Sequence, residues 1–290
     1  MTDLFKAFII LLTGVVLFFS GCVKLALRLS PSLIPSFTEA IFEECDPGLS
    51  KDAIPANLKI LEGLLKNDPG NKRILTALSM GYAGYSMLFI DEYDPERASA
   101  LFLRARNYGI QALGDKGRVL INPGVSKLDL QDILGSLGDQ DFVGLLWATV
   151  SQNAWISINL DKPKAIALLN NTEACLKRIL QMNPNYLYGL PYILMGSALS
   201  ARPPMLGGNP QTAKGYFEKA MEISRGKSFL VQYLFAYYYA VRVQDKNLFL
   251  KLIDDIAIGE PHDLKDICLI NSVIQQKAAR LKKKVNELFI

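Results

Sequence analysis

Apolar residues recur every three to four positions through most of the chain, which is the period of an amphipathic α-helix. The alternation of apolar and polar residues that marks strands is nearly absent. Turn sequences such as Asn67-Asp68-Pro69-Gly70-Asn71, and helix starts such as Asp94-Pro95-Glu96, set the ends of several helices. The pattern predicts an all-α fold, with helices at about 52–66, 72–90, 95–113, 127–137, 142–160, 163–182, 186–200, 210–225, 228–243, 246–257 and 264–287.

The helical pattern is duplicated within the chain. A shift of 115 residues, without a gap, gives ten identities over the 45 positions from 61 to 105, where chance supplies about two or three. The shift places Gly81 on Gly196, where we expect close helix contacts, and Phe102 on Phe217 within an apolar face of the same spacing. We therefore expect one helical domain over 51–290, with its duplicated parts at about 53–113 and 168–228.

The repeated segment resembles a tetratricopeptide repeat. Residues 213–223, which read AKGYFEKAMEI, are similar to the second helix of such a repeat, although the preceding turn is five residues longer than the consensus. A further unit is legible over 229–261. The resemblance implies a tetratricopeptide-like solenoid of helical hairpins, and a last helix at 264–287 would cap it by covering an apolar face.

The first 21 residues read as a lipoprotein signal peptide. An apolar run from Ala7 to Phe19 is followed by Ser20, Gly21 and Cys22, and this run is shorter than the roughly 20 residues that span a bilayer. The sequence resembles a bacterial lipobox with Cys22 as the acylated residue, except that Phe19 stands where leucine is usual. Residues 22–50 would then form the tether and N-terminal segment. An uncleaved membrane anchor and an ordinary hydrophobic helix are the alternatives.

The remaining cysteines do not form a metal-binding pattern, since Cys45, Cys175 and Cys268 are far apart and lack C-x-x-C spacing. Cys175 and Cys268 lie in apolar helical patterns and are expected to be small buried residues. The pattern around Cys45 does not decide whether it is buried in the same way. One disulfide is compatible with an oxidising compartment.

Composition narrows the possible functions. Half of the residues are hydrophobic, which is enough for a sizeable core, and the net charge of +4 is scattered, so nucleic acid is not an expected partner. His262 is the only histidine, and no nucleotide-binding glycine motif is complete. We therefore expect neither a catalytic site nor a metal or other cofactor.

The C-terminal third carries a more specific resemblance. Residues 201–210, ARPPMLGGNP, together with 237–241, YYYAV, and Phe249 are similar to the T-component family of tripartite ATP-independent periplasmic (TRAP) transporters. That resemblance implies a lipoprotein of the bacterial cell envelope that faces the periplasm, forms a homotrimer and binds the periplasmic solute-binding protein, with a hydrophobic or organic-acid ligand as cargo. The alternative is a scaffold lipoprotein of an unrelated envelope complex.

Two groups of residues are candidates for binding a partner or ligand. One is the loop after residue 201, where glycines permit a sharp turn. The other is a set of tyrosines, because the run from Leu234 to Tyr239 exceeds one helical turn and cannot all face one core. The candidate residues are Arg202, Pro203, Met205, Gly207, Gly208, Tyr186, Tyr188, Tyr238 and Tyr239.

Overall fold

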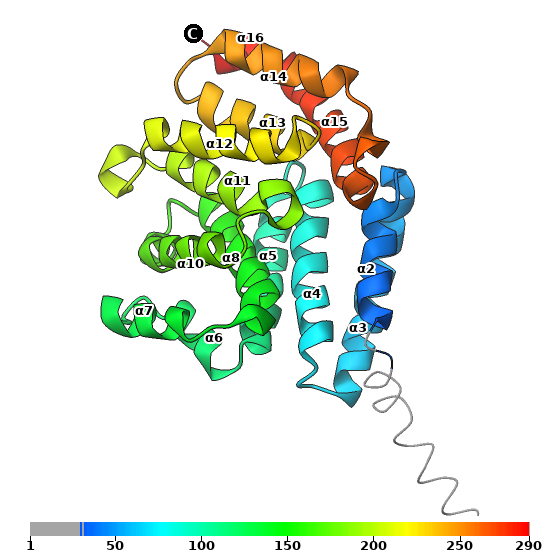
Figure 1. Ribbon diagram of the computed structural model, residues 1–290, viewed down its shortest axis with the longest axis vertical. Coiled ribbons are helices and arrows are strands. Elements are labelled where there is room, and N and C mark those ends of the chain that lie inside the picture. The colour runs from blue at the N-terminus through cyan, green and yellow to red at the C-terminus, as the bar shows by residue number, and fades with distance from the viewer. Residues whose placement is uncertain (1–29, 31, 290) are drawn as a thin grey trace, which may run out of the picture.

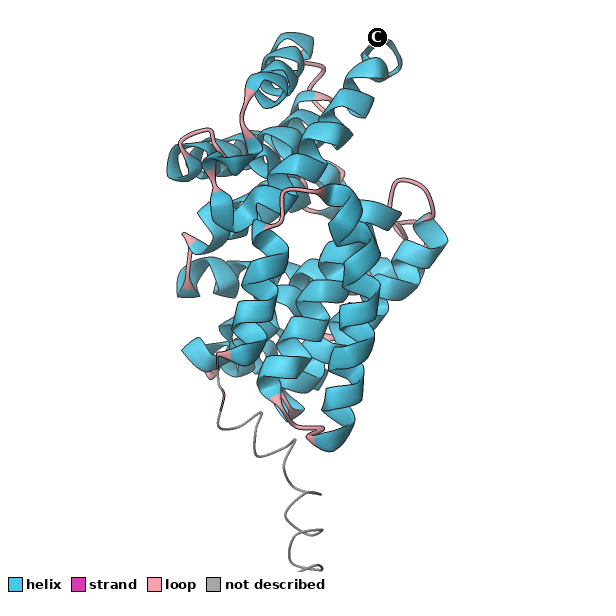
Figure 2. Ribbon diagram, turned by 90° about the vertical axis from the view of Figure 1, so that its right-hand side faces the viewer, coloured by secondary structure: helices cyan, strands magenta, loops and turns pink. Residues whose placement is uncertain are grey.

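Helices account for the secondary structure of the part of the chain that the computed structural model describes, residues 30 and 32–289, and no strand occurs there (Figure 2). The all-α prediction is confirmed. The predicted signal peptide and Cys22 lie outside the described residues. Within those residues, no helix is both long and apolar enough to cross a bilayer.

The helices of the first half run from Leu33 to Ser157 (Figure 1): α2 (Leu33–Glu43), α3 (Pro47–Asn67), α4 (Lys72–Tyr85), the π-helix η1 (Ser86–Ile90), α5 (Pro95–Ala112), α6 (Asp115–Leu120), α7 (Lys127–Gly135), η2 (Asp139–Asp141) and α8 (Phe142–Ser157). Most follow the predicted boundaries. The structure adds α2 and α6, which the sequence pattern did not predict.

The second half contains α9 (Pro163–Ile166), α10 (Leu169–Met182), α11 (Tyr186–Ala201), η3 (Pro204–Leu206), α12 (Pro210–Ser224), α13 (Phe229–Leu234), the π-helix η4 (Phe235–Ala240), α14 (Lys246–Ile258), η5 (Pro261–Asp263), η6 (Lys265–Ile267), α15 (Cys268–Lys283) and α16 (Val285–Leu288). The predicted helix 163–182 is therefore two helices, and 264–287 is divided into η6, α15 and α16.

Short polar side chains cap the helices at the predicted starts. Asp94 and Asn209 occupy equivalent positions in the two repeats, and each accepts a hydrogen bond of 3.0 Å from the backbone N–H three residues later. Each is followed by proline, whose fixed φ suits the first helical position and whose missing N–H has no role there. The sequence therefore sets both helix starts through local chemistry alone.

The duplicated helices form two hairpins, α4 with α5 and α11 with α12. Phe102 and Phe217 are both buried at equivalent places in them. A Cβ atom on Gly81 would lie 2.6 Å from Leu58, and one on Gly196 would lie 3.0 Å from the Phe217 ring. Both glycines thus permit close contact, as expected, but Gly81 faces the preceding helix and Gly196 faces the following one.

The additional residues between the paired helices fold differently in the two repeats. In the first repeat α4 continues into η1, where the Asp91 N–H donates to the Ser86 carbonyl five residues earlier. In the second repeat α11 ends and a loop follows at 202–209. The predicted continuous helices 72–90 and 228–243 are corrected accordingly, since each becomes a π-helix before its turn.

Helix α15 joins the two ends of the chain. It packs against α13 and α14 and also against α2, α3 and η1 (Figure 1). At its first residue, Cys268 forms a disulfide with Cys45, which lies between α2 and α3. Cys268 is buried, as expected, but it is not an unpaired apolar residue, because the packing of α2 on η6 and α15 brings Cys45 beside it. Cys175 is buried and free.

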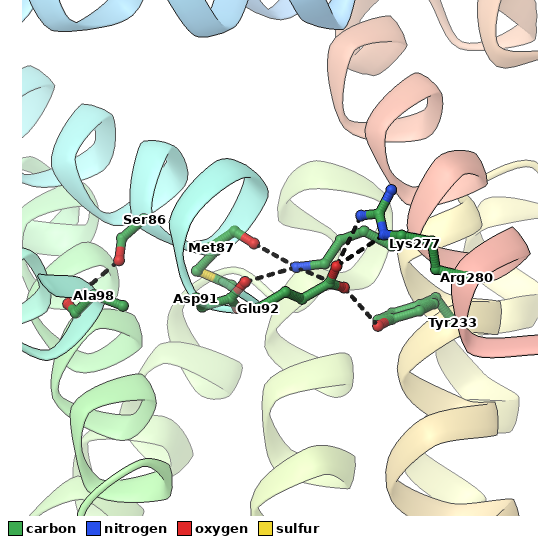
Figure 3. Close-up of polar contacts among 8 residues, drawn as sticks. All are labelled: Ser86, Met87, Asp91, Glu92, Ala98, Tyr233, Lys277 and Arg280. Carbon is green, nitrogen blue, oxygen red and sulfur yellow. Dashed lines mark hydrogen bonds and ion pairs between the residues drawn. The ribbon is translucent and has the colours of Figure 1, made fainter. Parts of the chain in front are cut away.

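A cluster of ion pairs around one buried lysine lies at the same junction (Figure 3). Lys277 of α15 is 5% exposed, and its ammonium group lies 2.7 Å from the Met87 carbonyl oxygen, 2.9 Å from Asp91 and 3.5 Å from Glu92. Arg280 donates to Glu92 from both Nε and Nη2, at 3.1 and 2.8 Å. Burial raises the pKa of Asp91. The charges are compensated only while α15 stays against η1.

We expect Cys45→Ser to destabilise the protein, because the disulfide closes a loop of 223 residues and limits the unfolded chain. The free energy of unfolding should fall by about 2–5 kcal/mol and the melting temperature by roughly 10 °C, as measured by calorimetry. Reductant should lower the wild-type melting temperature by a similar amount and leave the variant unchanged. A wild type that is insensitive to reductant would contradict the assignment.

Lys277→Met should cost about 3–5 kcal/mol in urea unfolding, because it leaves the partly buried Asp91 without its cation, whereas Glu92 keeps Arg280. Lys282→Met is the matched control, since that lysine pairs with Asp254 at the surface, where such a pair contributes less than about 1 kcal/mol. Combining Lys277→Met with Asp91→Asn should recover part of the loss. Equal costs for the two lysine variants would show that the cluster does not hold the junction.

Candidate functional site

The loop between α11 and α12 is a closed turn built by two glycines. Gly207 has φ +84°, and a Cβ on Gly208 would collide with the Arg202 carbonyl group. The N–H of Gly208 donates to the Pro203 carbonyl oxygen at 3.1 Å, and the N–H of Asn209 donates to that of Leu199 at 3.0 Å. These bonds hold the loop in one shape, as the predicted role of the glycines requires.

The side chains of this loop differ in their exposure to solvent. Met205 is 90% exposed, whereas the neighbouring Leu206 packs against the core. Arg202, at the end of α11, is only 3% exposed. The loop thus presents one flexible apolar side chain to solvent and buries one cation beneath it.

Arg202 is held by an ion pair with α10. Its Nη1 donates to Glu173 Oε2 at 2.9 Å, and Lys177 contacts the other oxygen of Glu173 at 2.7 Å. Burial alone would raise the pKa of Glu173, but the hydrogen bond from Lys177 and the charges of both cations lower it overall. Glu173 is therefore ionised, and it fixes the position of the Arg202 guanidinium group.

Arg202 also lines a small cavity of about 20 Å³ (the Arg202 cavity). Its other lining residues come from α8, α10, α11, η4 and the turn after α8: Asn153, Ile156, Ser157, Leu160, Leu169, Ser197, Ala198, Ala201 and Tyr238. The cavity combines an apolar floor with several hydrogen-bonding groups. It also brings together Arg202 and Tyr238, which the sequence proposed separately.

The tyrosines of η4 point in different directions. Burial raises the pKa of Tyr238 to about 12, so this hydroxyl group stays protonated at the Arg202 cavity. Tyr239 is buried and packs against Phe235 with ring centroids 5.3 Å apart. Tyr237 is 43% exposed and stacks on Tyr233. Of the two candidates in this segment, only Tyr238 lines the cavity.

Tyr186 and Tyr188 do not lie on one regular helix, contrary to the predicted helix 186–200. Leu187, Tyr188 and Gly189 all have positive φ values of 42°, 57° and 86°, so the backbone makes a left-handed turn before Pro191. Gly189 lies close to α12, where a Cβ would be 3.4 Å from Ala220. The physical reason for the break is this close approach together with the proline, which cannot donate in a regular helix.

The left-handed turn sends the two rings to different neighbours. Tyr186 packs edge-on against Phe142, with ring centroids 5.1 Å apart. The Tyr188 hydroxyl donates to Asp266 at 2.6 Å. Burial is the larger cause and this hydrogen bond the smaller cause that raise the pKa of Tyr188 to about 12. Neither tyrosine lines the Arg202 cavity. Tyr188 instead connects α11 to the segment before α15.

A second concavity was missed by the sequence reasoning. An apolar cleft of about 150 Å³ lies between α2, α3 and α4, with Phe37 and Ile60 exposed at its edge and Gly81 and Gly84 in its lining. Its α2 wall lies within residues assigned to the tether and N-terminal segment. The spacing of Ile34, Phe37 and Ile41 is a helical signal that could have revealed this wall.

Neither concavity has the residues of a metal centre. In the described part of the chain, no group of three or more histidine, cysteine or acidic residues is arranged to hold a metal ion. His262 lies on the surface in η5, with Nδ1 3.8 Å from Glu260. Apolar side chains line both concavities, and Arg202 adds a charged group to one of them.

Comparison with known proteins places the chain in a family. A family model described as TRAP transporter T-component matches residues 43–289. The chain is also 22% identical, over 284 residues, to an uncharacterized protein of Treponema pallidum (strain Nichols), with 88% of this chain and 84% of that protein covered. The family comprises accessory proteins of transporters and not enzymes. Because the match extends from the end of α2 to α16, the chain belongs to the T-component family of TRAP transporters.

Proposed function

We propose that this chain is the membrane-anchored, periplasm-facing accessory protein of a TRAP uptake system, and that it binds the cognate solute-binding protein and receives that protein's hydrophobic or organic-acid ligand. The family match over 43–289 carries the proposal. A lipid on Cys22 holds the protein at the bacterial envelope, because acyl chains contribute about 0.8 kcal/mol per buried CH₂. The body self-associates as a homotrimer.

The body acts as a tetratricopeptide-like solenoid over 51–290. The hairpins α4–α5 and α11–α12, followed by η4–α14, support this arrangement because each packs on its neighbours in chain order. Helix α15 acts as the cap. Such scaffolds bind partners through loops and faces that a rigid core holds in place.

The loop at 202–209 is the proposed contact for the solute-binding protein. Its backbone is fixed by internal hydrogen bonds, so little conformational entropy is lost when a partner binds. Met205 is 90% exposed on this fixed turn, and a methionine side chain adapts to an apolar pocket on another protein.

We expect Met205→Asp to weaken capture of the cognate solute-binding protein by about ten-fold or more, because a carboxylate would be desolvated at the interface. The measurement is surface plasmon resonance with the full chain in detergent micelles. Ile258→Asp is the matched control, since Ile258 is 81% exposed at the end of α14 and is not part of the loop, and it should change the affinity less than two-fold. Equal effects would argue against the loop, and no binding by wild type would favour the scaffold of an unrelated envelope complex.

The lipid anchor has a separate test. Cys22→Ala should move the protein from the detergent-rich to the aqueous phase in a Triton X-114 partition and should abolish incorporation of radiolabelled palmitate. Cys175→Ala is the control, because Cys175 is a buried thiol of α10 and the variant should remain lipidated. Labelling of the Cys22→Ala variant would refute the lipobox assignment.

A further inference from the structure

We propose that residues 23–29, which precede α2, fold onto the apolar cleft between α2, α3 and α4 and close it with their apolar side chains. These residues lie outside the described part of the chain. The inference goes beyond the proposed function, and it requires neither a lipid on Cys22 nor the solute-binding protein. It gives the cleft a partner within the chain itself.

The apolar cleft has a buried floor and an uncovered edge. Ile54 and Leu58 of α3 are buried in its floor, whereas Phe37 and Ile60 at its edge are 58% and 60% exposed. Large apolar side chains that stay exposed beside an apolar concavity are typical of a surface that another apolar group covers. The cleft therefore has the character of an interface that lacks one side.

Gly84 of α4 adds room to this cleft. A Cβ atom at Gly84 would meet nothing within 4 Å among the described residues, so neither close packing nor a positive φ requires glycine there. Glycine within a helix also lowers helix stability. The cleft volume of about 150 Å³ is comparable to that of apolar cavities that take up benzene, so roughly one or two aliphatic side chains fit into it.

Residues 23–29 have the amphipathic pattern that such a cleft requires. They read VKLALRL, and Lys24 and Arg28 are their only charged residues. In an extended chain the apolar positions 23, 25, 27 and 29 share one face, away from both charges. In a helix the two charged positions, four residues apart, share a face opposite most of the apolar ones. Either conformation gives one apolar face and one basic face.

The segment also ends at the edge of the cleft. The Leu33 N–H donates to the Ser30 carbonyl oxygen at 3.2 Å, and the next residue, Ile34, lines the cleft. Pro31 disfavours a helical conformation at Ser30, so the chain leaves the path of α2 there. Seven extended residues span about 23 Å, and the 11 residues of α2 span about 17 Å. The segment is long enough to follow the whole α2 wall.

The test is labelling of single introduced cysteines by a water-soluble maleimide, in the full chain held in nanodiscs of phosphatidylethanolamine and phosphatidylglycerol. Detergent is avoided because its tail would compete for an apolar cleft. The wild type gives the background, which the native cysteines keep low, since Cys45 and Cys268 are joined and Cys175 is buried.

The expected result is a difference between the two faces of the segment. Leu25→Cys and Leu27→Cys should react about ten-fold more slowly than Lys24→Cys and Arg28→Cys, because only the apolar positions are covered. Equal labelling rates at all four positions would overturn the proposal.

Filling the cleft identifies what covers the segment. Gly84→Leu should displace it and raise the labelling rates of Leu25→Cys and Leu27→Cys to those of the basic positions. Gly63→Leu is the matched control and should leave the rates unchanged, because Gly63 is also a helical glycine with open space around its Cβ position but does not line the cleft. Leucine favours helix over glycine, so thermal midpoints at or above wild type would show that both variants are folded. If Gly84→Leu does not fold, Ile60→Asp at the exposed edge should release the segment instead.

Two other arrangements have their own outcomes. Slow labelling that survives the folded cleft variant would show that the bilayer covers the segment, and it would overturn the proposal. For a second copy, the Leu27→Cys chain is co-expressed with an excess of chain that carries Gly84→Leu and the native leucine. The labelling rate should not change, whereas faster labelling would place the segment in a neighbouring copy and overturn the proposal. No readout involves the solute-binding protein, so failure here would leave the proposed function standing.

Discussion

The burial of Lys277 is the constraint on which the arrangement of the helices depends. A charged ammonium group that is 5% exposed requires acceptors, and all of those around it come from Met87, Asp91 and Glu92 near the end of the first hairpin. Moving α15 away from η1 would therefore separate the Lys277 ammonium group from all three of these acceptors. The disulfide from Cys268 to Cys45 joins the same helix to the segment before α3. The two connections make a closed body of helices that otherwise contact mainly their neighbours in sequence.

Much of the fold could be predicted because its signals are local. Asp94 and Asn209 cap helices through hydrogen bonds to residues three positions away. Phe102 and Phe217 each lie in an apolar pattern with the period of a helix face. The contacts of α15 with the N-terminal helices have no such signal. The sequence around Lys277 does not distinguish it from a surface lysine, because its acceptors are about 190 residues away in the chain. The left-handed turn at 187–189 was equally hidden, because Leu187 and Tyr188 have no preference for positive φ and adopt it where α12 is close.

The candidate site was predicted in pieces. Arg202 and Tyr238 stood out in the sequence for unrelated reasons, and the structure places both in one cavity. Tyr186, Tyr188 and Tyr239 lie elsewhere, so aromatic content alone was a poor guide to a shared surface. Ser197 was not predicted at all, because a serine within a helix has no distinguishing pattern. In the structure its hydroxyl group is buried without a hydrogen-bond partner, and the residue lines the same cavity as Arg202.

The disulfide has a consequence for the order in which the chain is made. Cys45 is synthesised 223 residues before Cys268, and Cys175 is added between them as an alternative partner. In the folded protein Cys175 lies within α10, 2% exposed, and burial raises its pKa to about 12, which suppresses the thiolate that thiol exchange requires. Early packing of α10 would therefore protect the correct pairing. The burial of Cys175 thus favours the covalent bond between Cys45 and Cys268.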